Sequence, residues 1–417
     1  MRAGVILPGN CRYAIVVSQV NSTYKWKQGV FQVKARFIPV IAVFLLIFGL
    51  VNGYIGWNGW EYLSSLFNLE HALPYGIIVG ILSFSWILGR LGQHSASPIR
   101  QMAYSLKYFG SYWFAVMQYS LIILPLADLI VWLLTLASVE YKTAVASVGT
   151  VAFILLASIL IRGAWNAWTP IVRTYKLTIP KQAGSFQKLR IGVASDIHLG
   201  TVVGNKHLER LVRHMEEMKP DLILLPGDVI DDSIDPFIRR NMAATMSKLK
   251  APLGVYAVLG NHEYIGGHIE QYIAEMNAIG IRVLLDEKIL IQDSFYIIGR
   301  KDLAARSSDP EGRLPISELT ATVNKALPLI MMDHQPSDLE QAALNGIDLS
   351  LSGHTHRGQM APNHLITRRI FELDWGYKLK GSLHAIVSSG FGSWGPPIRL
   401  GSRSEIIQVE LEFKPEQ

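Results

Sequence analysis

Five short motifs rich in histidine and aspartate lie in a fixed order in the second half of the chain. They are Asp196-Ile197-His198, Gly227-Asp228-Val229-Ile230-Asp231, Gly260-Asn261-His262-Glu263, Asp333-His334-Gln335-Pro336 and Gly353-His354-Thr355-His356. Their carboxylate, amide and imidazole groups are the oxygen and nitrogen ligands that divalent metal ions such as manganese, iron or zinc accept. Together the motifs predict a pair of metal ions held side by side, which is a recurrent arrangement for hydrolysing phosphate esters.

The residue types in these motifs suggest a ligand role for each group. Asp196 and His198 alternate by two, so both can reach one metal ion from a tight loop. Asp228 follows a glycine, which lets the backbone come close, and its two carboxylate oxygens could bridge both ions. The other expected ligands are one amide oxygen and three imidazoles, those of Asn261, His334, His354 and His356.

The charge of this ligand set indicates the kind of substrate. Two carboxylates, those of Asp196 and Asp228, set against two divalent ions leave a net charge of about +2, which attracts an anionic phosphate. The same excess of positive charge lowers the pKa of a metal-bound water toward neutrality. The sequence therefore predicts two divalent ions (Mn, Fe or Zn) and a phosphorylated substrate.

Each motif follows a short apolar run, which indicates how the motifs are positioned. These runs predict buried strands over 189–194, 222–225, 255–259, 329–332 and 347–351. Ligands bind beyond the carboxyl ends of strands in open α/β sheets, so the five loops should converge at one sheet edge. Helices are expected over 208–218 and 268–278, and further strands over 296–299, 385–389 and 405–412. The expected fold is α/β, with two packed mixed β-sheets flanked by helices.

The first part of the chain has a different composition. Over the whole chain of 417 residues, hydrophobic residues make up 50% and charged residues only 17%, and the apolar residues are concentrated in this first part. Four apolar stretches are each long enough for a bilayer crossing of ~20 residues. They are Phe37–Gly56, Pro74–Gly92, Ser111–Ala137 and Thr143–Ala164. We therefore expect an all-α transmembrane four-helix region over 37–165, in which Asp128 makes an interhelical hydrogen bond.

Lysine and arginine residues lie on alternate sides of these stretches. They precede the first stretch, connect the second to the third and follow the fourth, whereas the loop after the first has none. By the positive-inside rule, both termini and the motif-bearing half should face the cytoplasm, with the spans in the inner or plasma membrane. The other expected segments are an N-terminal tail at 1–36, a linker at 166–188 and a soluble domain at 189–417.

Composition also argues against two other interpretations. Cys11 is the only cysteine, so neither an internal disulfide framework nor a cysteine-based zinc site is expected. Much of the net charge of +6 flanks the apolar stretches, where membrane topology requires it. The soluble half has no basic run with interleaved aromatic residues, so we expect no specific nucleic-acid partner.

The ordered motifs resemble those of the calcineurin-like metallophosphoesterase superfamily. Its pattern is Asp-x-His, Gly-Asp-x-x-Asp, Gly-Asn-His-Asp/Glu, a later His, and Gly-His-x-His. The resemblance extends from about Leu189 to Leu411 and includes the closing segment Ser388–Arg399. The chain looks most like the bacterial membrane-anchored branch, in which transmembrane helices precede the phosphoesterase domain. The resemblance thus implies the metallophosphoesterase fold.

The resemblance also implies a role for each motif residue. The metal ligands would be Asp196, His198 and His356 for the first ion, Asp228 as the bridge, and Asn261, His334 and His354 for the second. His262 would be the general acid that protonates the leaving oxygen, while a hydroxide between the metals attacks phosphorus in line. Asp231 would support the site without binding metal itself.

Several residues outside this set carry weaker signals. Arg357 directly follows the last ligand and is a candidate substrate contact, with a structural ion pair as the alternative. The stretch 299–313 has several basic residues and is expected to rim the pocket. Three further histidines lie on helical patterns and are expected at the surface, namely His207, His214 and His268.

These expectations combine into a membrane-anchored, metal-dependent phosphoesterase acting on a phosphodiester, pyrophosphate or phosphomonoester bond. Because the spans place the site near the bilayer, a lipid-linked or headgroup phosphate is one candidate substrate, and a soluble nucleotide is another. The main alternative is a non-catalytic membrane sensor or assembly factor that uses the metal fold as a binding module. A transporter with a regulatory domain would need more polar residues within the spans than Asp128.

Overall fold

The computed structural model describes residues 38–93 and 95–414, so the expected tail at 1–36 lies outside the described residues. The chain divides into two compact units at Leu50. The first unit contains, among its described residues, only the beginning of helix α1. The second unit, from Val51 onward, contains the rest of α1, the other helices and both β-sheets.

Four helices are long and apolar enough to cross a membrane, as expected from the sequence. They are α1 (Ile38–Phe67), α2 (Ala72–Gly92), α3 (Ser97–Leu136) and α4 (Tyr141–Trp168). Helix α3 has 40 residues and begins well before the predicted Ser111. The apolar pattern did not reveal its first turns, because they contain the charged residues Arg100 and Lys107. The Tyr54 hydroxyl donates to Asp128 Oδ2 at 2.5 Å, which confirms the interhelical hydrogen bond expected of this acid.

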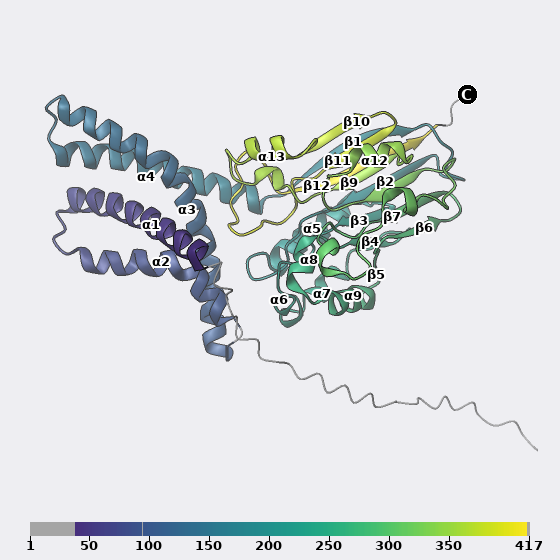
Figure 1. Ribbon diagram of the computed structural model, residues 1–417, viewed down its shortest axis with the longest axis horizontal. Coiled ribbons are helices and arrows are strands. Elements are labelled where there is room, and N and C mark those ends of the chain that lie inside the picture. Colours follow the sequence, from purple (N-terminus) through teal and green to yellow (C-terminus); the bar gives the residue numbers. More distant parts are fainter. Residues whose placement is uncertain (1–37, 94, 415–417) are drawn as a thin grey trace, which may run out of the picture. The chain divides into compact units, whose positions relative to one another are not determined.

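Twelve strands form two six-stranded sheets among the described residues (Figure 1). The first sheet has the order β1 (Ile171–Ile179), β12 (Glu405–Phe413), β2 (Lys188–Val193), β3 (Leu222–Pro226), β4 (Val255–Val258), β5 (Ile281–Val283). The second has the order β10 (Gly376–Lys380), β11 (Leu383–Val387), β9 (Leu349–Ser352), β8 (Leu329–Met332), β7 (Phe295–Gly299), β6 (Glu287–Ile291). Both sheets contain parallel and antiparallel pairs, so the expected mixed sheets are present.

The two sheets pack face to face, and the pattern of residues in β3 explains why. All five residues of this strand are buried, as expected for a parallel strand covered on both faces. Leu222 and Leu224 belong to the core between the sheets, together with Ile330 of β8 and Leu349 of β9. The alternate residues of β3 contact a second core formed with the flanking helices.

Nine further α-helices, most of them short, accompany the sheets in the described part of the chain. They are α5 (Asn205–Met218), α6 (Asp235–Arg239), α7 (Met242–Met246), α8 (Asn261–Gly266), α9 (Ile269–Ala278), α10 (Ala305–Ser308), α11 (Ile316–Leu319), α12 (Leu339–Leu344) and α13 (His364–Ile370). Helices α5 and α9 confirm the two predicted from apolar spacing. His207 was wrongly expected at the surface. It is buried, with its ring stacked on Phe391 at 4.2 Å and edge-on to Trp168 at 5.1 Å.

The segment expected to be a linker, 166–188, is mostly part of the folded domain. Residues 171–179 form β1, which pairs in parallel with β12 along its whole length. Two residues, Thr169 and Pro170, separate the end of α4 from the start of β1. The alternating pattern of β1 places Leu177 and Ile179 in the core, and this burial accounts for the pairing.

Candidate metal centre

The five motifs occupy loops at the carboxyl ends of five parallel strands, but these strands belong to two sheets. The loops after β2, β3 and β4 come from the first sheet, and the loops after β8 and β9 come from the second. The expectation of a single sheet edge was therefore incomplete. Because the sheets pack face to face, the ends of their parallel strands meet and bring all five loops together.

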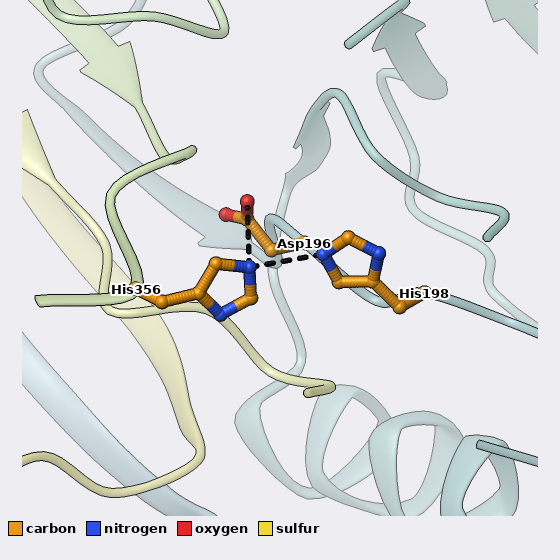
Figure 2. Close-up of side chains that lie close together, drawn as sticks. All are labelled: Asp196, His198 and His356. Carbon is orange, nitrogen blue, oxygen red and sulfur yellow. Dashed lines mark hydrogen bonds and ion pairs between the residues drawn. The ribbon is translucent and has the colours of Figure 1, made fainter. Parts of the chain in front are cut away.

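One group of side chains joins the first and the last motif (Figure 2). Asp196, His198 and His356 each offer one ligand atom, and these atoms all lie within 4.8 Å of one another. The Nε2 atoms of His198 and His356 are 2.9 Å apart, and His356 Nε2 is 3.4 Å from Asp196 Oδ1. All three residues are buried, so this group forms a compact ligand set inside the protein.

A second group joins the middle motifs. Ligand atoms of Asp228, His334 and His354 also lie within 4.8 Å of one another. Asp228 Oδ2 is 3.1 Å from His334 Nε2 and 3.9 Å from Nε2 of His198, a member of the first group. The side-chain oxygen of Asn261 is 2.8 Å from Nδ1 of His354. Asp228 therefore lies between the two groups, where a bridging ligand is expected.

The chemistry of these donors fits a pair of cations. His334 Nε2 is buried, and its near partner among the described residues is the shared Asp228 carboxylate at 3.1 Å, in a geometry that makes no regular hydrogen bond. Burial lowers the pKa of His198 to about 3 and that of His356 well below its usual range, so both imidazoles are neutral. Neutral imidazole is the form that binds metal. A positive ion in each group would satisfy the facing lone pairs.

Five of the proposed ligands have a strained backbone. Positive φ angles of 52°, 50°, 51°, 70° and 47° occur at Asp196, His198, Asp228, His354 and His356. Residues other than glycine rarely adopt this left-handed region, and each such residue costs roughly 1–3 kcal/mol. Strain of this kind persists where the surrounding fold fixes the backbone, and its concentration at these five residues is typical of a functional site.

Glycines in the motifs allow the close approach of neighbouring loops. A Cβ atom on Gly353 would lie 1.9 Å from Ser195 Oγ and 2.1 Å from Asp196 Oδ2. A Cβ atom on Gly260 would lie 2.1 Å from Asp228 Oδ1. All three distances are far below van der Waals contact, so these positions require glycine for the carboxylates of Asp196 and Asp228 to reach the centre.

Comparison with known proteins gives this geometry a family. The profile of the family described as calcineurin-like phosphoesterase matches residues 189–358. An uncharacterized metallophosphoesterase of Aquifex aeolicus is 34% identical over 251 residues, which cover 58% of this chain and 95% of the relative. The chain belongs to the metallophosphoesterase family.

Other metallophosphoesterases match beyond the soluble domain. An uncharacterized one from Campylobacter jejuni is 27% identical over 388 residues, covering 89% of this chain and 98% of the relative. A zebrafish protein named as a transmembrane protein with metallophosphoesterase domain is 30% identical over 272 residues. That match covers 63% of this chain and 62% of the zebrafish protein, so this chain matches less than two thirds of that relative's length.

In this member of the metallophosphoesterase family, His262 lies beside the expected ligands without being one of them. Its ring centroid is 4.6 Å from that of His198, and one of its nitrogens lies within 4.8 Å of ligand atoms of His198 and Asp228. Burial disfavours the charged imidazolium, but the hydrogen bond to Asp232 and the nearby carboxylates outweigh it and raise the pKa of His262 to about 9. His262 is therefore protonated at neutral pH, as a general acid must be.

The partner of His262 is a residue that the motif pattern does not predict. His262 Nδ1 is 2.8 Å from Asp232 Oδ1, whereas the expected supporting residue, Asp231, is 3.6 Å away. Each of these two acids also binds a cation from a membrane helix. Arg90 of α2 lies 3.2 Å from Asp232, and Lys107 of α3 lies 3.6 Å from Asp231. Only the consecutive Asp231-Asp232 pair in the sequence could have signalled this arrangement.

Glu263 and Arg399 are two further residues that hold the site and were not predicted. The Glu263 carboxylate accepts hydrogen bonds from the backbone amides of Asp228, Ile230 and Gly260 at 3.2, 3.0 and 2.7 Å, which ties two ligand loops together. The guanidinium of Arg399 is fully buried, and its Nη2 lies 3.1 Å from His356 Nδ1. The final residue of the Gly-Asn-His-Glu motif was the available signal for Glu263.

The basic residues that the sequence suggested as substrate contacts or as the rim of the pocket contact other protein residues. The guanidinium of Arg357 stacks on the Trp375 ring at 4.0 Å, and no ion pair to it occurs among the described residues. In the stretch 299–313, Arg300 and Arg313 both bind the buried Asp333 carboxylate, at 2.8 and 2.5 Å. These two basic residues therefore stabilise the loop before His334.

Proposed function

We propose that this chain is a membrane-anchored phosphoesterase that uses two divalent ions to hydrolyse a phosphodiester, pyrophosphate or phosphomonoester bond. The observation that carries the proposal is the joining of two complete ligand groups through Asp228, with a protonated His262 beside them. Four helices capable of crossing a membrane precede the domain, and family members include proteins named as transmembrane.

The ligand groups assign the metal-binding residues. Asp196, His198 and His356 would hold one ion, and His334, His354 and Asn261 the other, with Asp228 shared. The bound ions would supply an activated water and neutralise the charge of the substrate phosphate. Manganese, iron and zinc all suit this ligand set, because it contains oxygen and nitrogen donors and no thiolate.

His262 would donate the proton that the leaving oxygen requires. Asp232 accepts the Nδ1 hydrogen at 2.8 Å, so Nε2 is the atom available to a substrate. Asp232 therefore fixes both the orientation of the ring and its charge. A general acid of this kind typically contributes roughly 10²- to 10⁴-fold to the rate.

We place the domain on the cytoplasmic side of the membrane. Arg90, Arg100 and Lys107 lie around the connection between α2 and α3, and positive loops remain inside the cell. Arg90 and Lys107 bind acids of the catalytic domain, so this connection and the domain share one side. A substrate carried by the bilayer, such as a lipid-linked or headgroup phosphate, suits that position.

The first experiment tests hydrolysis with the full chain purified in detergent and loaded with manganese. We expect turnover of bis-(p-nitrophenyl) phosphate and of an alkyl diester such as glycerophosphocholine. His262→Ala should slow the alkyl diester far more, because p-nitrophenolate leaves without protonation. His214→Ala, at a histidine paired with Glu217 at 3.5 Å on α5, is the matched control and should keep full activity.

The second experiment separates an enzyme from a binding module. Lipid, nucleotide and phosphoprotein substrates would be compared with the metal-loaded protein. If the protein is inert with manganese, iron and zinc, and His262→Ala retains its cellular role, the domain is a non-catalytic sensor or assembly factor and the proposal is wrong.

A further inference from the structure

Helix α3 is longer than a membrane crossing requires. Its 40 residues span about 60 Å at 1.5 Å per residue, whereas the apolar core of a bilayer is about 30 Å thick. The first half of α3 therefore begins outside the core, on the side of the catalytic domain. The contact of Lys107 with Asp231 at 3.6 Å places this half against the domain.

A cavity of about 640 Å³ lies between this half of α3 and the catalytic domain. Helix α3 lines it with Ser97, Arg100 and Tyr104, which recur every three to four residues and so share one helix face. The domain contributes Thr201, Arg239 and Arg240. Thr201 lies three residues after the ligand His198, so the cavity is next to the metal centre but contains none of its ligands.

The lining has the chemistry of an anion site. It includes three guanidinium groups and no carboxylate. The Nη1 atom of Arg240 is held 3.3 Å from the backbone oxygens of both Gly200 and Thr201, and its guanidinium lies 5.3 Å from the centre of the Tyr104 ring. Arg100 donates to the Ser95 oxygen at 3.4 Å, and Arg239 is exposed. Arginine donors and hydroxyl groups that line one cavity can pair with the oxygens of a phosphate.

The surroundings of the cavity indicate that this phosphate belongs to a lipid. Ile99, Met102 and Phe109 on the same half of α3 are 51%, 59% and 62% exposed, and Phe109 also lines the cavity. Exposed apolar side chains beside basic ones are typical of a membrane interface, where acyl chains and headgroups meet. A volume of about 640 Å³ also exceeds what a lone phosphate fills.

We propose that this cavity binds the phosphate of an anionic lipid headgroup, at a site separate from the metal centre. Arg100 and Arg239 contact the headgroup from opposite walls, and Arg240 is held in place between them. The bound lipid joins α3 to the catalytic domain beside the loop that contains His198. This binding does not depend on hydrolysis at the metal centre, so it can be tested even where no turnover is found.

The test uses the full chain in nanodiscs, without metal and with Asp228→Asn, so that the metal centre does not contribute. Spin-labelled phosphatidic acid and spin-labelled phosphatidylcholine are added in turn, and the fraction immobilised at the protein is measured. We expect phosphatidic acid to bind about tenfold more tightly than phosphatidylcholine, because an additional hydrogen bond to a charged group increases affinity by about this factor. Equal binding of the two lipids would overturn the proposal, and this comparison requires no further variant.

Single substitutions test whether the preference for phosphatidic acid arises from the arginine residues that line the cavity. Arg100→Gln and Arg239→Gln should each reduce the preference for phosphatidic acid severalfold, with folding checked by gel filtration and thermal unfolding. Arg213→Gln removes the same charge from an exposed position on α5 and should leave the preference intact. If Arg213→Gln has as large an effect as Arg239→Gln, the preference reflects overall charge and the site is wrong.

Competition distinguishes a lipid from a soluble phosphate. Inorganic phosphate at millimolar concentration should leave phosphatidic acid bound, because the acyl chains hold the lipid in the interface. Complete displacement by inorganic phosphate would mean that the cavity is a site for soluble phosphate, and the lipid proposal would fail.

Discussion

His262 Nδ1 lies 2.8 Å from Oδ1 of Asp232, the residue immediately after the aspartate that the Gly-Asp-x-x-Asp pattern identifies. The other oxygen of Asp232 binds Arg90, which lies in the last turn of the second membrane helix. The proposed proton donor, His262, is thus oriented by an acid that a membrane helix also contacts. Arg90 is 46% exposed, so its ion pair is worth at most about 1 kcal/mol.

The first prediction concerns pH. The pKa of His262 is raised to about 9, so the active protonated form is lost as the pH rises through about 9. Asp232→Asn removes a carboxylate that raises this pKa, and the alkaline limb of kcat should move to lower pH. A kcat profile with an alkyl diester measures the shift. Asp293→Asn, at an exposed turn, is the control, and an unmoved limb for Asp232→Asn would contradict the role of Asp232.

The second prediction concerns metal stoichiometry. Asp228 lies between both ligand groups, whereas His356 belongs to one of them. Asp228→Asn should therefore weaken the binding of both ions, whereas His356→Ala should weaken the binding of only one ion. Because residues that only support a metal ligand already change affinity about 10- to 100-fold, the loss of a ligand should be at least as large. Elemental analysis after gel filtration gives the counts, and equal losses in the two variants would exclude a bridging Asp228.

The third prediction concerns stability. Ligands that bind only the folded state stabilise it, so manganese at 100 times its dissociation constant should add about 2.7 kcal/mol. For a domain of this size that corresponds to a rise in Tm of roughly 5–10 °C. Differential scanning fluorimetry with and without a chelator measures it. The rise should disappear in Asp228→Asn, and its persistence there would assign the stabilising ion to another site.

The fourth prediction concerns the contact between α4 and the catalytic domain. A Cβ atom on Gly163 would lie 2.5 Å from a methyl carbon of Ile398, and Arg399 N donates to the Gly163 oxygen at 2.9 Å. Gly163→Val should displace this segment and cost about 1–3 kcal/mol, a typical penalty for overpacking. Since Arg399 contacts His356, hydrolysis should fall as well.

The control for this experiment is Gly80→Val in α2. A Cβ atom on Gly80 has no neighbouring atom within 4 Å, so this variant measures the cost of valine in a membrane helix without a clash. If both variants hydrolyse substrate equally well, the α4 contact has no influence on the centre.

Eight of the twelve strands that the structure describes, and the motif residues, could be predicted from the sequence because both have local signals. Buried runs such as Leu222–Pro226 are continuous and apolar, and each ligand follows one directly. Asp232 escaped prediction because the path of the loop, which has no sequence signature, decides which of two adjacent acids faces His262. Arg90 and Lys107 lie more than 120 residues from their partners, and no periodic pattern connects them.

The linker was predicted wrongly for a related reason. β1 alternates exposed and buried residues and gains its stability from pairing with β12, a strand more than 230 residues away. A segment with this pattern beside a membrane helix is indistinguishable from a spacer until its partner strand is known.

The passage from α4 to β1 through two residues determines what the centre can reach. A domain on a long flexible linker explores a volume set by the length of that linker, and it meets soluble molecules and lipids alike. Here the last of the four apolar helices continues almost directly into a paired strand, so in the proposed arrangement the metal centre would keep a nearly constant height above the bilayer. A centre held in this way would meet the phosphates presented at that distance from the membrane before the shape of its pocket could select among them.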